Sequence, residues 1–298
     1  MTRLIFFATA FLFSTGLAFG QNELQYEISF PNAVHHEAEV SLKVSQIPAG
    51  PLTVRMSRSS PGRYATHEFG KNVYSVKAFN FSGQPIKITQ VQGDVYEIEN
   101  HGGGAKITYT VFGNWIDGTY LGIDNTHAHM NMPATFMWVK GMENRSISIK
   151  FNDLEKYGWK VATQLLPGKA NTFTAANLQY FMDSPTELSA FKLSSWDDTN
   201  TDKTKQIIRV STHTPDGQQI VDKFGKMVKT VVEESKAVFT ELPKFDHGVY
   251  TFLQDVNPDN AGDGMEHRNS TVIVERTPKI EGFESDLLGT FSHEFFHA

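Results

Sequence analysis

Hydrophobic and polar residues alternate with a period of two along the first half of the chain, from about residue 24 to residue 160. The alternation is clearest in five segments: LQYEISF, EVSLKVS, PLTVRMS, AKITYTVF and RSISIKF. Turn-forming residues, such as the glycines at 102–104, separate the segments. Many short strands at regular spacing predict an antiparallel, sandwich-like β domain.

The pattern becomes helical in the second half of the chain. Between residues 216 and 243, apolar residues recur every three or four positions, which predicts an amphipathic helix. Asp216 with Gln219 resembles a capping box at its start, and Pro243 marks its end. The segments GVYTFLQDV and STVIVE then favour strands, and helical character returns from about Ser285. An α+β domain is therefore expected to follow the β domain.

The first twenty residues have the features of a secretion signal. Arg3 precedes an apolar stretch over residues 4–13, and small residues at 18–20 offer a cleavage site before Gln21. A membrane anchor is the alternative, but the stretch is short for a bilayer span. No later segment is apolar enough to span a membrane. We therefore expect a mature protein that is secreted or periplasmic.

Composition narrows the possible functions. The 298 residues carry a net charge of −6 and contain no basic stretch, which argues against nucleic acid as the main partner. The chain has no cysteine, so it cannot form disulfides, use a thiolate nucleophile or hold zinc through thiolates. Its stability must come from core burial or from a bound metal.

A metal-binding motif, H-E-x-x-H, stands at the end of the chain in residues 293–297. Because an α-helix turns about 100° per residue, His293 and His297 lie on one face of a helix. Two imidazoles placed this way suit zinc, which accepts nitrogen ligands and leaves a position for water. Glu294 lies about a quarter turn away, where it can take a proton from that water. The opposite side of the helix is apolar and is expected to be buried: Leu288, Phe291 and Phe295.

A catalytic zinc site needs three protein ligands, and this motif supplies two. No residue follows Ala298, so the third ligand is expected in further sequence. We therefore expect the chain to be the amino-terminal part of a longer protein and to be inactive as a peptidase by itself. The alternative is a chance occurrence of the motif in a protein that binds no metal.

A second motif lies about thirty residues upstream, in the segment GDGMEHRNSTVIVE. Gly262 and Gly264 followed by a strand-like stretch suggest a loop that leads into an edge strand. Glu266 in such a strand can face the metal-binding helix. Its alternative role is a surface carboxylate that pairs with Arg268 or with solvent.

Together these motifs resemble the glycyl aminopeptidase family of zinc metallopeptidases, which are gluzincins that usually carry a trailing PDZ domain. The specific matches are GMEHRNST at 264–271 and SHEFFHA at 292–298. Weaker matches occur in the same order as in the family: SPGRYATHEFGKNV, DNTHAHMN and MDSPTEL. The resemblance implies a β-rich amino-terminal domain followed by a thermolysin-like catalytic domain.

The resemblance also implies the roles of individual residues. It assigns His293 and His297 as zinc ligands and Glu294 as the catalytic base. It implies that a short strand, formed by Gly264, Met265 and Glu266, binds the peptide substrate. Glu266 is then expected to meet the free amino group of the substrate through a charge-assisted hydrogen bond. The third zinc ligand, the group that stabilises the oxyanion and the PDZ domain are all expected downstream.

The chain is thus predicted to contain three parts: a signal peptide at 1–20, a β domain at 21–178 and an incomplete catalytic metallopeptidase domain at 179–298. A zinc aminopeptidase is the favoured function. One alternative is a zinc endopeptidase of related fold, in which Glu266 has only a structural role. Another is a secreted β-sandwich binding protein with an inert, protease-like end.

The sequence contains other histidines that could bind a metal, but we expect them to have structural roles. The adjacent residues His35 and His36 point to opposite faces of a strand, which makes a poor metal clamp. His127 and His129 can share one face, but the methionines at 130 and 132 favour core packing there. The loop around Arg63 either lines the cleft or forms a structural turn.

Overall fold

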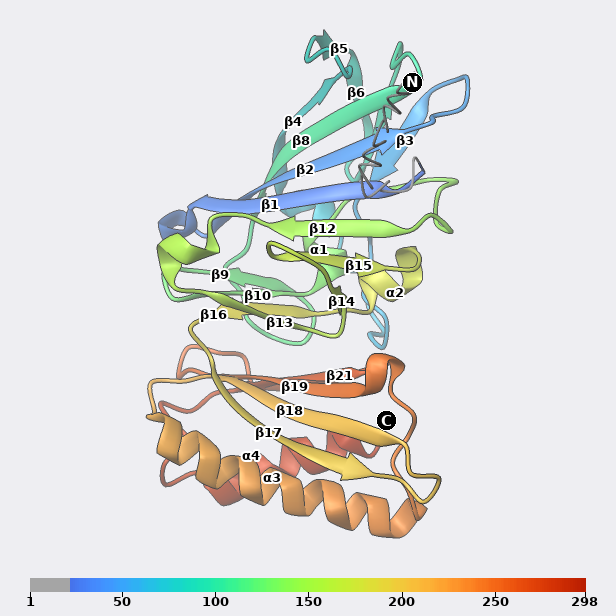
Figure 1. Ribbon diagram of the computed structural model, residues 1–298. Coiled ribbons are helices and arrows are strands. Elements are labelled where there is room, and N and C mark those ends of the chain that lie inside the picture. Colours follow the sequence, from blue (N-terminus) through green and yellow to red (C-terminus); the bar gives the residue numbers. More distant parts are fainter. Residues whose placement is uncertain (1–21) are drawn as a thin grey trace, which may run out of the picture.

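The computed structural model describes residues 22–298, so the predicted signal peptide lies outside the described residues. The first half of the chain forms three β-sheets, and the second half forms a fourth sheet with two long helices (Figure 1). The β-rich amino-terminal domain predicted from the period-two pattern is confirmed. Among the described residues, no helix combines the length and the apolar character needed to cross a bilayer.

The largest sheet has eight strands in the order β14-β15-β12-β1-β2-β8-β4-β5. Their bounds are β1 Leu24–Asn32, β2 Glu37–Ser45, β4 Val73–Phe79, β5 Pro85–Ile86, β8 Gly104–Phe112, β12 Ile147–Phe151, β14 Leu166–Pro167 and β15 Thr172–Ala175. The alternation sets their faces, because side chains at every second position of β2 are buried and the others are not. The pairings are antiparallel except for one, since β1 runs parallel to β12.

Two four-stranded sheets complete the first half, and all three sheets share one apolar core. One sheet has the order β13-β16-β10-β9: β9 Leu121–Ile123, β10 His127–Met130, β13 Lys160–Thr163 and β16 Thr186–Ser189. The other has the order β11-β3-β7-β6: β3 Leu52–Arg55, β6 Ile88–Gln92, β7 Val95–Ile98 and β11 Trp138–Val139. Short helices lie between strands: α1 Met132–Thr135, α2 Leu178–Met182, and the 3-10 turns η1 Ala33–His35, η2 Phe69–Asn72 and η3 Leu154–Tyr157.

Strand β16 bears on the division between the domains, which was predicted at residues 178 and 179. It comes after that point, yet it pairs with β10 and β13 of the first half. The next strand, β17 (Lys192–Thr199), belongs to the fourth sheet. The strand pairing therefore favours a change of domain near residue 190.

The fourth sheet has the order β17-β18-β19-β21-β20. Its further strands are β18 Lys205–His213, β19 Val249–Val256, β20 Asp263–His267 and β21 Ser270–Glu275, with the 3-10 turn η4 at Asp246–Gly248. The three middle strands are parallel, and the two outer strands are antiparallel to their neighbours. Strand β19 is buried on both faces, which is typical of a parallel strand covered on each side.

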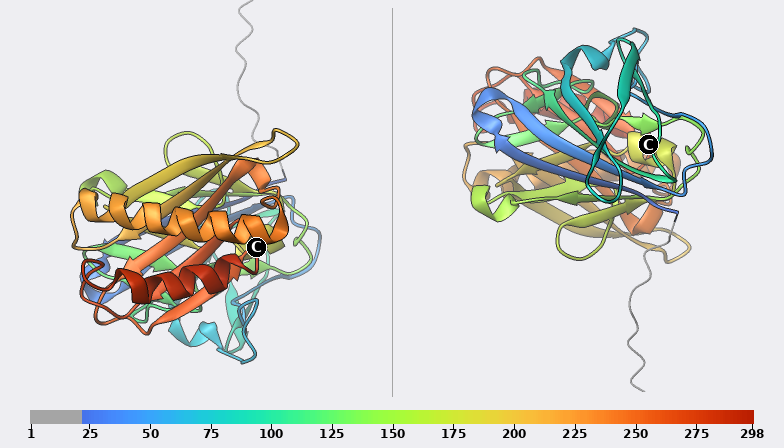
Figure 2. Two further views of the ribbon diagram at one scale, coloured as in Figure 1. Left: turned by 90° about the horizontal axis from the view of Figure 1, so that it is seen from below. Right: turned by 90° about the horizontal axis from the view of Figure 1, so that it is seen from above.

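Two helices cover one face of the fourth sheet, α3 (Gln218–Phe239) and α4 (Glu284–Phe295), as seen from below in Figure 2. The opposite face of this sheet packs against the first half of the chain (Figure 1). There, Ala162 of β13 joins a small apolar cluster with Leu253, Met265 and Val272 of the fourth sheet. The edge strand β20 is therefore held between the two halves of the molecule.

Helix α3 confirms the predicted amphipathic helix, but the predicted capping box is wrong. The N-cap residue is Gly217, and no side chain caps the helix. The Asp216 carboxylate instead accepts hydrogen bonds from the Thr214 hydroxyl, at 2.9 Å, and from the Ile280 N–H, at 2.6 Å. Asp216 thus ties the start of α3 to the segment before α4, a partner that lies 64 residues away in the sequence.

Candidate functional site

The end of helix α4 and the turn that follows it, at residues 296–297, bring His293 and His297 together as the spacing of the motif predicts. Their Nε2 atoms are 3.4 Å apart, and both side chains are exposed. Two ligands of one tetrahedral zinc ion, with bonds of about 2.0–2.1 Å, lie about 3.3–3.4 Å apart. The separation therefore fits a shared metal ion. On the apolar back of the helix, Phe291 and Phe295 are buried as predicted, and Leu287 is more deeply buried than Leu288.

Glu294 lies on the side of α4 that faces β20, and only 7% of it is exposed. Its carboxylate occupies the space beside Gly264, where a side chain is missing. A Cβ atom at Gly264 would lie 2.7 Å from Cδ and 2.8 Å from Cγ of Glu294, which is closer than real Cβ contacts. Glycine at position 264 therefore allows Glu294, the candidate catalytic base, to pack against strand β20.

Glu266 completes an acidic and imidazole cluster at the same place. One donor atom each from Glu266, Glu294 and His297 lie within 4.8 Å of one another. Burial raises the pKa of Glu294, the Glu266 carboxylate raises it further, and the two histidines oppose the shift. Imidazole nitrogens beside carboxylate oxygens are the donor set that zinc takes in hydrolases. The residues present therefore fit a divalent zinc-type ion.

Strand β20 lies at the edge of the fourth sheet, as predicted for the segment with the second motif. Within residues 22–298 it pairs only with β21, so its outer edge is not paired with another strand. Gly264 and Glu266 share the face toward α4, whereas Met265 is buried on the other face. The three residues predicted to bind substrate therefore do not all face the same side of the strand. Two residues face the candidate metal site, and Met265 anchors the strand to the first half of the molecule.

The first half of the molecule holds the start of β20 through a residue that the sequence analysis did not single out. The Asp263 carboxylate forms an ion pair with Arg63 and accepts a hydrogen bond of 2.9 Å from the Gly118 N–H. The Arg63 loop therefore contacts strand β20 itself, while the neighbouring Tyr64 is fully exposed. Asp263 lies inside the segment of the second motif, between Gly262 and Gly264, but its position there gives no signal of a partner in the first half.

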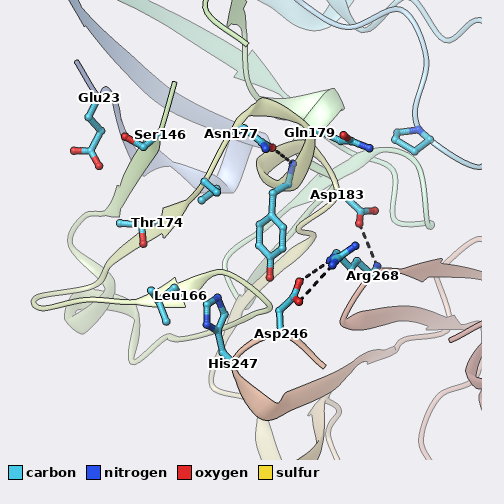
Figure 3. A pocket seen from close by; sticks show the side chains of 14 residues that line it. Glu23, Ser146, Leu166, Thr174, Asn177, Gln179, Asp183, Asp246, His247 and Arg268 are labelled. Atoms are coloured by element: carbon cyan, nitrogen blue, oxygen red, sulfur yellow. Dashed lines mark hydrogen bonds and ion pairs between the residues drawn. The ribbon is translucent and has the colours of Figure 1, made fainter. Parts of the chain in front are cut away.

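The end of β20 is held in a similar way (Figure 3). Asp183 accepts hydrogen bonds from the Nδ1 of His267, at 2.8 Å, and from the Arg268 N–H, at 3.1 Å. The Arg268 guanidinium pairs with Asp246, not with Glu266 as the alternative interpretation had it. A pocket of about 1020 Å³ opens beside these groups, between the two halves. Its labelled lining residues are Glu23, Ser146, Leu166, Thr174, Asn177, Gln179, Asp183, Asp246, His247 and Arg268.

Glu275, at the end of β21, is a carboxyl group next to α4 whose pKa is shifted by its surroundings. Burial raises the pKa of its carboxyl from 4.5 to about 7, although a hydrogen bond from Thr290 opposes the shift. The folded state therefore binds this proton more tightly than the unfolded state does. The contribution of Glu275 to the free energy of unfolding should be largest below pH 4.5 and should be lost as the pH rises through about 7.

Glu275→Gln is expected to remove this loss. Its free energy of unfolding at pH 8 should exceed that of the parent by about 1 kcal/mol, a value reduced for partial exposure, with little difference at pH 4. Urea unfolding at the two pH values measures the difference. Glu234→Gln, on the exposed face of α3, is the control. An equal effect of Glu275→Gln at both pH values would contradict the assignment.

A β-rich domain that leads into an α+β domain, with an H-E-x-x-H helix beside an edge strand, defines a protein of the metallopeptidase type. Residues 25–190 match the Peptidase M61 N-terminal domain, which is more than half of the chain. The chain therefore belongs to the peptidase M61 family. The predicted relationship to peptidases is confirmed at the level of the family.

Solved structures show the same fold. An aminopeptidase N family protein from Idiomarina loihiensis is similar with a TM-score of 0.74 and 22% identity, over 92% of this chain and 47% of that chain. Legionella pneumophila aminopeptidase A, solved with aspartic acid, gives a TM-score of 0.53 and 12% identity, over 92% of this chain and 34% of that chain. This chain thus spans about half the length of the Idiomarina protein. The comparison with curated protein sequences found no match.

Proposed function

We propose that this chain carries the zinc-binding helix and the substrate strand of an aminopeptidase, which hydrolyses peptide bonds at the amino terminus of peptides. The observation that carries the proposal is the meeting of α4 and β20. His293 and His297 lie 3.4 Å apart, and Glu294 fills the space left by Gly264. The family and the fold support the same class of protein.

The residues of the H-E-x-x-H motif have two different roles in the proposed reaction, metal binding and proton transfer. A bound zinc ion supplies a Lewis acid that polarises water and the scissile carbonyl. His293 and His297 would hold the ion through their imidazole nitrogens, and their exposure leaves the site open to substrate. Glu294, whose pKa is raised by burial, accepts a proton from water and returns it to the leaving amine.

Strand β20 provides the proposed binding site for the peptide. An extended peptide can add to its outer edge as a further strand, through backbone hydrogen bonds. Glu266, on the α4 side of the strand, then offers its carboxylate to the ammonium group of the substrate. This contact selects chain ends and distinguishes an aminopeptidase from an endopeptidase. The trailing PDZ domain and export directed by residues 1–20 belong to the same proposal.

The first experiment measures metal. In the whole gene product, His293→Ala combined with His297→Ala is expected to lower the zinc content by about one ion per chain, because both imidazole ligands are lost. Elemental analysis of the dialysed protein gives the count. His35→Ala combined with His247→Ala changes two exposed histidines elsewhere and should leave the zinc content unchanged. Equal zinc content in parent and α4 variant would reject the proposed centre.

The second experiment measures which peptides are cleaved. The whole gene product should hydrolyse peptides with a free amino terminus, and acetylation of that terminus should lower kcat/KM by about 10²-fold or more, because Glu266 then loses its charged partner. Equal cleavage of both forms would indicate an endopeptidase. An absence of cleavage of either form, together with insensitivity to chelators, would indicate a binding protein.

A further inference from the structure

A second cluster of possible metal ligands lies between the two halves of the molecule. His127 comes from β10 in the first half, while His213 and Asp255 end the neighbouring strands β18 and β19 of the fourth sheet. One donor atom from each of the three lies within 4.8 Å of the other two. The α4 site lies on the other face of this sheet, so the two clusters are separate (Figure 1).

The contacts within this interdomain cluster are close. The Oδ1 of Asp255 is 2.8 Å from the Nδ1 of His213, and its Oδ2 is 3.6 Å from the Nε2 of His127. The other nitrogens of the two rings, His127 Nδ1 and His213 Nε2, are 3.2 Å apart. Ligand atoms around a tetrahedral zinc ion are separated by about 3.3–3.4 Å. These three distances join different atom pairs, and with one donor atom per side chain the three atoms lie within 4.8 Å of one another, so a shared ion requires a small movement of the side chains.

Two of these atoms are buried and lack a hydrogen-bond partner among the described residues: His127 Nε2 and Asp255 Oδ2. The side chains of His127 and Asp255 are 0% and 1% exposed, so bulk water does not solvate them. Leaving a buried polar atom unpaired costs about 1–3 kcal/mol, and more for a charged group. A group bound between His127 and Asp255 would satisfy both atoms.

The charges point to a cation as that group. Asp255 and the nearby Glu187 are both buried, and each of their ion pairs in residues 22–298 is made with a histidine. The two carboxylates bring two negative charges into the interface. Buried charges of this kind are paired or coordinate a metal. A single divalent cation balances them without protonating any histidine.

We propose that His127, His213 and Asp255 bind a divalent transition-metal ion of the zinc type, which joins the β domain to the α+β domain. Two imidazoles and one carboxylate are ligands that suit zinc, cobalt or nickel, whereas magnesium and calcium favour sites made only of oxygen. The side chain of His213 is 18% exposed, which gives the ion a route of entry. The role of this ion is structural, because it would connect strands from both halves of the molecule.

The test uses the whole gene product with His293→Ala and His297→Ala, which removes the α4 site. After dialysis against metal-free buffer and titration with zinc or cobalt, this variant is expected to bind about one ion per chain. Adding His213→Gln or Asp255→Asn should weaken that binding by more than about tenfold. His247→Ala in the same background changes an exposed histidine outside both clusters and should leave the binding unchanged.

Thermal unfolding gives a second measurement, which does not depend on peptidase activity. With the metal at about 100 times its Kd, the Tm of the α4 variant should rise by roughly 5 °C or more, and the rise should disappear with His213→Gln. Circular dichroism establishes that each variant is folded. The proposal is overturned if the α4 variant binds no metal, or if His213→Gln and Asp255→Asn bind as tightly as their parent. A Tm that responds to pH but not to metal also overturns it, because a shared proton then supplies the positive charge.

Discussion

Glu294→Gln is expected to remove most peptide hydrolysis from the whole gene product while leaving its zinc content unchanged. The amide has nearly the same shape as the carboxylate, so it can remain in the space beside Gly264. It cannot accept a proton at neutral pH, so the general base is lost. General acid–base catalysis contributes about 10²–10⁴-fold, and kcat should fall by an amount in this range.

Steady-state kinetics and elemental analysis of the same preparation separate the two parts of this prediction. Glu281→Gln is the matched control, because Glu281 is exposed just before α4 and pairs only with Lys279 in the described structure. That variant should keep both zinc and turnover. Hydrolysis by Glu294→Gln at the parent rate would mean that another group is the base. Loss of zinc in Glu294→Gln would mean that Glu294 has a role in holding the metal.

Gly264→Ala has the second largest expected effect. The new methyl group would overlap the Glu294 side chain, so either Glu294 or strand β20 must move. A displacement of about 1 Å at a reacting group can reduce the rate about 10²-fold, and kcat/KM should fall by about that factor. The methyl group meets Glu294 and neither His293 nor His297, so zinc binding should remain.

Gly93→Ala is the control for this substitution, because a Cβ atom at Gly93 meets no heavy atom within 4 Å. It should keep the parent kcat/KM, zinc content and Tm. Parent-level turnover by Gly264→Ala would show that the close packing of Glu294 on β20 is not needed for catalysis. The two glycines thus separate a specific contact at the site from the general cost of replacing glycine.

The structure also explains how the β domain contributes to the candidate site without supplying any of its metal ligands. It holds β20 at both ends, through Arg63 on Asp263 and through Asp183 on His267. Met265 is buried between these two contacts. The position of Gly264 and Glu266 relative to α4 therefore depends on a domain that is distant in the sequence.

The local parts of this arrangement could be predicted from the residues alone. Alternating side chains define a strand, and a spacing of four places His293 and His297 on one face of a helix, because backbone geometry determines both patterns. The edge strand carrying Gly264 and Glu266 was predicted from its turn residues and its apolar tail. Such patterns depend only on residues close together in the sequence, so the strands and helices that they predict are also found in the folded chain.

Long-range contacts could not be predicted in the same way. The sequence pattern suggested that Asp216 caps α3. In the tertiary structure its carboxylate instead accepts a hydrogen bond from the Ile280 N–H. The core packing expected next to His127 is confirmed for Met130 and Met132. Folding also brings the His127 ring to His213 and Asp255, from strands far along the chain, which the sequence did not indicate. The sequence by itself determined the alternating strands, the amphipathic helix and the two motifs. Only the tertiary structure decided which polar groups meet, because those meetings depend on how the strands are ordered and how the two domains pack.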